Sequence, residues 1–306
     1  MLSIFYNNHI VMNKNMILAG LALLFAACSN NENDINFNNS NELVPVKVHV
    51  TGFSVAQEEF PATRAAQSVG DYSGVKVVTL AFYKGATEVY KHEQVRGALE
   101  EGETLGEFDC SLPMGSYTMV VIARGQGDND GFTLTSPTEA AYTGDHSRET
   151  FAYTEAVNIT NTSAVDISAT LNRIIAKLEV HSSDGRAANV TNVRMTMSAG
   201  GKSFNPTSGL ATVNTGFANT VPISTAAGVT SNSVSYLFLA TDEQNVDVTI
   251  ETLDSNGAVL FSKTVNNVPF KRNRVTILTG AMYTNDAVSG TFKLETAWLT
   301  KEDVAF

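Results

Sequence analysis

The chain has 306 residues, of which 43% are hydrophobic and 17% charged, and its formal net charge is -11 at pH 7. This length suffices for one large domain or two ordinary ones, each with its own core. An acidic body without a basic, aromatic-interleaved patch repels phosphate backbones, which argues against a nucleic-acid partner. The chain is rich in Thr, Ser, Asn, Val and Ala, a composition that favours strands and turns over helices.

The N-terminal segment has the pattern of an export signal. An apolar run extends from Met16 to Ala27, with Lys14 before it and Cys28 after it. The run is too short to cross a bilayer but has the size of a signal-peptide core, so residues 1–27 are predicted to be a signal peptide. The sequence Phe-Ala-Ala-Cys at 25–28 resembles a bacterial lipobox, in which the cysteine thiol of Cys28 is acylated. The alternative is a plain secretory signal followed by a chance cysteine.

Acylation would anchor the chain, because each buried methylene adds about 0.8 kcal/mol of membrane affinity. The residue after the cysteine is Ser29 rather than an aspartate. By resemblance to known lipoproteins, this implies an outer-membrane location. Residues 29–42 contain almost no apolar side chains and cannot bury surface. The segment 28–43 is therefore predicted to be a flexible tether.

Regular alternation begins after the tether. Apolar side chains share one face of the first predicted strand, while Lys47 and His49 share the other; the apolar residues are Val44, Val46, Val48 and Val50. Residues 54–74 are polar with Gly and Pro, and are predicted to form an exposed loop that contains Arg64.

Short strand patterns continue to the end of the chain. They are expected at 75–84, 116–124, 164–182 with a bend, 192–199, 234–240, 246–253, 259–265, 274–283 and 290–299. Turn pairs such as Asp184-Gly185 and Asn256-Gly257 separate them, and only 136–144 has a short helical pattern. Many short strands with regular turns predict an all-β protein built of β-sandwiches. One sandwich rarely needs more than about 150 residues, so two domains are expected, at 44–168 and 169–306.

No motif predicts catalysis, a metal or a cofactor. The segment around Asp128, Asp130 and Gly131 lacks calcium ligands at both ends of the loop, and a polar hairpin turn explains it better. Gly201-Lys202-Ser203 lacks the first glycine of a phosphate loop. The five histidines show no ligand spacing. Cys110 has no His or second Cys near it in sequence and is interpreted as a small buried hydrophobic residue.

The combined pattern resembles the fimbrillin family, the lipoprotein pilus subunits and anchors of Bacteroidales-type bacteria. The features that carry it are the lipobox, the first strand VPVKVHVTGF, the loop FPATRAAQ, and the pair LNRIIAKLEV with VPFKRNRVTILTGAMY. The resemblance covers about residues 16–299. It implies two tandem transthyretin-like β-sandwiches, no enzymatic activity, and assembly with other fimbrial subunits by strand exchange.

The resemblance also implies roles for single residues. A protease would cut the loop between Arg64 and Ala65, and the first strand with Val44, Val46, Val48 and Val50 would then leave. The alternative is that Arg64 is an ordinary loop arginine. The strand that refills the groove is expected at 290–306, with Phe292, Leu294 and Trp298 as its apolar side chains. The alternative for 290–299 is an ordinary closing strand of the second domain.

The sequence therefore predicts a structural subunit of a surface fimbria, in a homo- or hetero-polymer that contributes to cell adhesion. One alternative is the lipid-retained anchor or cap of the same pilus, which would keep its first strand. Another is a monomeric surface lipoprotein that binds glycans or host proteins. An enzyme is the least favoured class.

Overall fold

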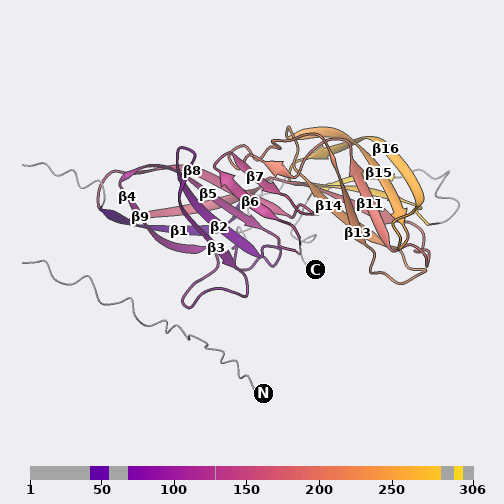
Figure 1. Cartoon of the computed structure of the whole chain (residues 1–306), viewed down its shortest axis with the longest axis horizontal. Coiled ribbons are helices and arrows are strands. Elements are labelled where there is room, and N and C mark those ends of the chain that lie inside the picture. The colour runs from indigo at the N-terminus through magenta and orange to yellow at the C-terminus, as the bar shows by residue number, and fades with distance from the viewer. Residues whose placement is uncertain (1–41, 55–67, 128, 284–292, 299–306) are drawn as a thin grey trace, which may run out of the picture. The chain divides into compact units, whose positions relative to one another are not determined.

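The computed structural model describes residues 42–54, 68–127, 129–283 and 293–298 (Figure 1). Every regular element in these ranges is a strand, which confirms the predicted all-β class. None of the described residues forms a helix long and apolar enough to cross a membrane.

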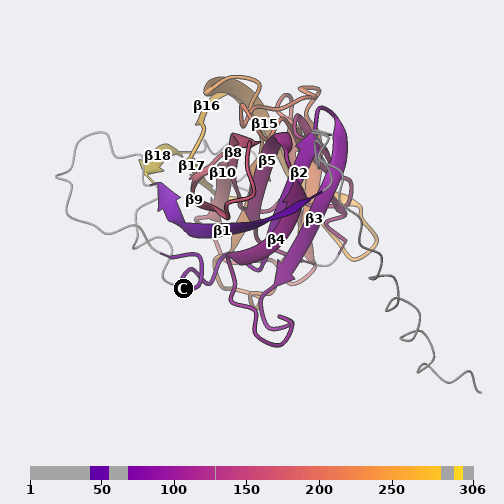
Figure 2. The same ribbon diagram turned by 90° about the vertical axis from the view of Figure 1, so that its left-hand side faces the viewer.

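Seven strands form sheet A, in the order β3-β2-β5-β8-β9-β1-β4. Their bounds in chain order are β1 Leu43–Ser54, β2 Val77–Lys84, β3 Thr87–Val95, β4 Glu107–Pro113, β5 Gly115–Arg124, β8 Thr150–Ile159 and β9 Val165–Arg173. Side chains from both halves of the sheet meet in one apolar cluster, so sheet A curls around its own core (Figure 2).

Gln94 of edge strand β3 donates to the Glu107 carbonyl of edge strand β4 at 2.8 Å, and accepts from the Gly106 N–H. This side chain thereby links the two edges of the sheet.

Strands β2 and β5 are buried on both faces. Leu80 and Met119 face the core that sheet A encloses, while Ala81 and Val120 belong to a second apolar cluster on the opposite face. This explains why both strands are continuous apolar runs rather than alternating ones.

Eight strands form two further sheets, in the orders β14-β10-β17-β18 and β13-β11-β15-β16. Their bounds are β10 Ala176–Ser182, β11 Asn192–Met197, β13 Phe217–Pro222, β14 Asn232–Leu237, β15 Glu243–Leu253, β16 Val259–Lys271, β17 Arg274–Gly280 and β18 Lys293–Trp298. Alternate residues such as Leu178, Val193 and Ile250 are buried in one cluster contributed by both sheets. The arrangement is a sandwich in which strands such as β10, β11 and β15 turn one face inward.

A small third component is the sheet β12-β7-β6, with β6 at Phe132–Ser136, β7 at Glu139–Tyr142 and β12 at Ser203–Phe204. The helical pattern expected at 136–144 is wrong, because β6 and β7 form an antiparallel hairpin there. Ala140 and Tyr142 are both buried, and β7 pairs with β12 on its other side. Pairing and burial on one face outweigh the weak helical preference of this alanine-containing stretch.

The predicted division at 168 falls inside β9, which pairs within sheet A over its length. The chain changes sheets between Arg173 and Ala176, since β10 pairs with β14 and β17. The division into domains 44–168 and 169–306 stays a prediction.

Candidate functional site

Strand β1 is an interior strand of sheet A, although it is the first strand of the chain. It pairs antiparallel with β4 over Leu43–His49 and parallel with β9 from Val46 onward (Figure 2). Pro45 lies opposite Ser111 of β4 and before the first residue paired with β9. Proline lacks a backbone N–H, so it is tolerated at the point where β1 has only one neighbour.

The inward face of β1 supplies apolar side chains to the core of sheet A. Val44, Val46 and Val48 are fully buried, and Val50 is 5% exposed. A register shift between Val50 and Gly52 inserts one extra residue, and Gly52 has φ 148°. The shift turns Phe53 inward as well, where its ring centroid lies 4.2 Å from that of Phe151. Phe53 was not among the predicted site residues, and Gly52 is the signal that could have indicated it.

The outward face of β1 carries two basic side chains between acidic neighbours. Lys47 Nζ lies 3.3 Å from Asp109 Oδ1 of β4. The His49 ring contacts the Glu107 carboxylate of β4 through Nδ1 and lies 3.0 Å from Asp166 Oδ1 of β9 through Nε2. Sequence reasoning placed Lys47 and His49 on the outer face but could not identify the acidic partners, because they lie far along the chain.

These contacts favour the protonated imidazole. The pKa of His49 is raised from its ordinary value of 6.5, chiefly by the hydrogen bond to Glu107. Slight burial lowers the pKa, the charges of Glu107 and Asp166 raise it, and the charge of Lys47 lowers it. Both ring nitrogens face carboxylates, so the imidazolium can donate on both sides of β1.

Cys110 lies on β4 directly opposite Val46 of β1. Its side chain packs against the core of sheet A, but it is only partly buried, whereas the sequence predicted a buried residue. Burial raises the pKa of the Cys110 thiol to about 11, with a smaller contribution from Asp109. The thiol is therefore protonated and weakly nucleophilic at neutral pH while β1 is in place.

The other predicted site residues are placed only in part. Cys28, Arg64, Ala65 and Phe292 lie outside the described residues. Leu294 and Trp298 belong to β18, which pairs antiparallel with β17 opposite Leu278 and Arg274. The structure therefore has 293–298 as a strand of the chain's own sheet, and its role as a donor strand stays a prediction.

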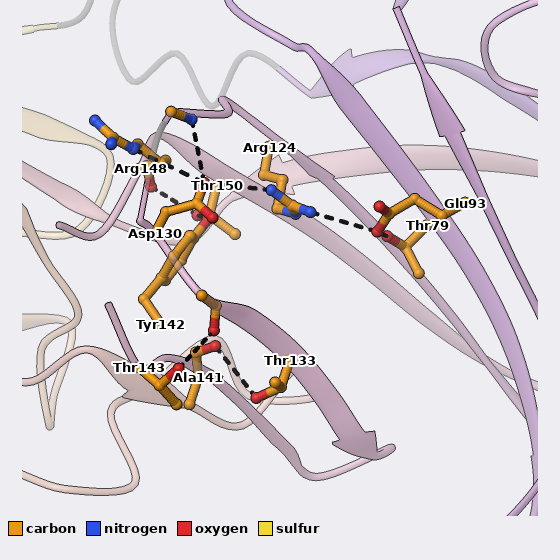
Figure 3. Close-up of polar contacts among 12 residues, drawn as sticks. Thr79, Glu93, Arg124, Asp130, Thr133, Ala141, Tyr142, Thr143, Arg148 and Thr150 are labelled. Atoms are coloured by element: carbon orange, nitrogen blue, oxygen red, sulfur yellow. Dashed lines mark hydrogen bonds and ion pairs between the residues drawn. The ribbon is translucent and has the colours of Figure 1, made fainter. Parts of the chain in front are cut away.

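A second polar cluster joins the β6–β7 hairpin to sheet A (Figure 3). Arg124 is buried at the end of β5, with Nη2 3.4 Å from Glu93 and Nη1 3.5 Å from Asp130. Its guanidinium lies 4.5 Å from the ring centroid of Phe132. The Asp130 carboxylate also accepts from the Gly127 N–H at 3.2 Å. This carboxylate pairs with arginine, and no group of His, Cys, Asp or Glu side chains in the described ranges is arranged to hold a metal ion.

A cleft of about 740 Å³ lies among β8, β9, the 206–209 turn and the loop between β16 and β17. Two ion pairs lie on its walls, Arg272 with Asp242 at 2.7 Å and Lys271 with Glu243 at 2.6 Å. Tyr153 contributes an aromatic ring to the lining. The cleft offers mixed polar surface rather than a cluster of one charge.

The model of a family of unknown function, DUF6562, matches residues 40–298 of the chain. The chain belongs to this family. The matched range of this DUF6562 protein begins before β1 and ends with β18, so both strands are part of the family pattern. A search of curated proteins finds no match.

The solved structures similar to this DUF6562 protein include the following three. The fimbrial anchor protein Mfa2 from Porphyromonas gingivalis has 10% sequence identity and a TM-score of 0.48, over 83% of this chain and 97% of that one. The tip fimbrial protein Mfa3 from Porphyromonas gingivalis has 11% identity and a TM-score of 0.40, over 84% and 99%. A presumed adhesin of Bacteroides ovatus has 11% identity and a TM-score of 0.48, over 86% and 96%. Fimbrial proteins are the group that the sequence resemblance named.

Proposed function

We propose that this DUF6562 protein is a fimbrial subunit with an adhesive role at the cell surface. It is exported, acylated at Cys28 and held at the outer membrane. Strand β1 is then a removable strand, which a neighbouring subunit replaces.

The observation that carries this proposal is the placement of β1. It fills the interior of sheet A between β4 and β9, yet it joins the rest of the described chain only at its C-terminal end. Arg64 lies in the sequence between β1 and β2, so cutting there would separate β1 from all the other strands. The cut would break no other described strand.

Loss of β1 would leave an apolar groove between β4 and β9, here called the slot, and filling it with a new strand would be energetically favourable. Five apolar side chains fill it, at about 1.5–3 kcal/mol each when buried, for a gross drive on the order of 10 kcal/mol. The facing backbones of β4 and β9 would also lose their hydrogen-bonding partner, and unpaired strand edges recruit strands from other chains. The donor proposed from the sequence is 290–306, with Phe292, Leu294 and Trp298 as its apolar side chains.

N-terminal sequencing of filaments sheared from cells tests the proposal. A subunit processed as proposed begins at Ala65, and an Arg64→Ala variant is not incorporated. Labelling with palmitate before shearing should mark the unprocessed chain, and Cys28→Ser should abolish the label. Filaments in which the chain still begins at Cys28 would contradict strand removal and favour the anchor, which retains β1 and the lipid. A chain never found in filaments would contradict the subunit proposal altogether.

A further inference from the structure

The two strands that flank β1 present only acidic charges on its outer side. The outward side chains of β4 are Glu107, Asp109 and Ser111, and those of β9 are Asp166, Ser168, Thr170 and Asn172. Glu107 and Asp109 lie opposite His49 and Lys47, and Asp166 lies next to Lys47 in the parallel register. Three carboxylates therefore border the slot, and the basic side chains that meet them both come from β1.

From this we propose that the slot selects its strand by charge, an inference that rests on the proposed removal of β1. The slot accepts a partner strand with cations two residues apart, at the positions of Lys47 and His49, flanked by apolar residues. Strands with an acidic residue at either position bind more weakly. The occupant is thus a basic, alternating strand of another protein.

Lys47 and His49 show how the selection works. Each faces at least one carboxylate across the strand, and His49 faces one on each side. A glutamate at position 47 would instead place three carboxylates in a row, between Asp109 of β4 and Asp166 of β9, and a glutamate at position 49 would lie opposite Glu107. Like charges directly opposite one another destabilise a strand pair, and opposite charges stabilise it. The inward valines contribute affinity that any strand with alternating apolar residues could match. The charges at the outward positions therefore decide which of these strands binds more tightly.

The chain's own C-terminal stretch fits this rule poorly. When Leu294 points inward, the outward neighbours in sequence are Lys293 and Glu295. Placing Lys293 at position 47 puts Glu295 at position 49, opposite Glu107, and placing Lys293 at position 49 puts the uncharged Thr291 at position 47. The slot should therefore discriminate against the tail of a second copy, which makes hetero-polymerisation the favoured mode.

A strand-exchange experiment tests the inference. The mature chain with Cys28→Ser receives a sequence-specific protease site in place of residues 62–66 and is nicked there, so that β1 stays bound but is no longer tethered. Fluorescent peptides are then added, with anisotropy as one readout. The alkylation rate of Cys110, which β1 faces at Val46, is the second readout.

Four peptides are compared at low ionic strength: residues 43–54, the same with Lys47→Glu and His49→Glu, the same with both changed to Gln, and residues 290–302. The basic peptide should bind about tenfold more tightly than the acidic one, since exposed ion pairs have small individual energies that add over three contacts. The neutral peptide and the tail should bind with intermediate strength. At 0.5 M salt the differences should shrink, because exposed charges are screened.

A reciprocal variant controls for peptide solubility. Glu107→Lys with Asp109→Lys in the nicked chain should reverse the order of the basic and acidic peptides. Equal binding of all four peptides to the unmodified slot would overturn charge selection while leaving strand removal intact. If even residues 43–54 fail to enter, β1 is not exchangeable, and the proposed function falls together with this inference.

Discussion

At the scale of single residues, His49 makes the stability of β1 in sheet A depend on pH. Its folded pKa is raised above 6.5, so its contribution to stability is complete below about pH 6.5 and is lost as the pH rises through the folded pKa. The unfolding midpoint of the wild type should exceed that of His49→Gln at pH 5.5, and the two should converge at pH 8.5. Urea titrations at both values measure this. A difference that grows with pH would contradict the ion-pair geometry.

A second residue, Asp130, is expected to hold the β6–β7 hairpin against sheet A. Its side chain is 11% exposed and faces the 6% exposed side chain of Arg124. Asp130→Asn leaves this arginine with Glu93 alone, so we expect a loss of roughly 2–3 kcal/mol in the free energy of unfolding, less than for a buried charge left wholly unpaired. Asp145→Asn, at an exposed neighbouring position, is the matched control and should change the unfolding free energy by less than about 0.5 kcal/mol.

At the scale of elements, β1 depends on its inward valines more than on its outward charges. Val48 is fully buried, and Val48→Ala removes two methyl groups from a packed core, at a cost of roughly 2 kcal/mol. Lys47→Ala on the same strand removes one exposed ion pair and should cost at most about 1 kcal/mol. The alkylation rate of Cys110 should rise more for Val48→Ala than for Lys47→Ala. Equal rates would show that opening at Cys110 does not involve β1.

The elements also differ in how well sequence patterns indicate them. β1 alternates strictly, and β2 and β5 are apolar runs, so all three were predicted. β3 is mostly exposed at an edge, and the middle of β8 is solvated, so neither shows an apolar period. The β6–β7 hairpin was missed because only its contacts with β12 and sheet A distinguish a short alanine-containing strand from a helical turn.

At the scale of the whole described body, an aromatic cluster joins the outer face of sheet A to residues that follow β10. Phe204 and Phe238 are fully buried with ring centroids 4.2 Å apart, in one cluster with Tyr83 and Ile122 of sheet A. Phe204→Ala should therefore destabilise the protein by about 3–5 kcal/mol. Val213→Ala, at a position 50% exposed, serves as the control and should have little effect. Calorimetry measures both; an unchanged Phe204→Ala transition would contradict a shared core.

The sequence by itself determined the local properties of this protein: a chain built mainly of strands, a first strand with one apolar face, and the expectation of an exported chain that resembles fimbrillins. These follow from side-chain spacing and composition, which act over a few residues. Only the tertiary structure decided that β1 lies inside sheet A, that a bulge at Gly52 adds Phe53 to its apolar face, and that Glu107, Asp109 and Asp166 border it. Those contacts join residues up to about 120 positions apart. Sequence periodicity contains no information on pairing between such distant strands, because pairing is selected by the burial of the complete core.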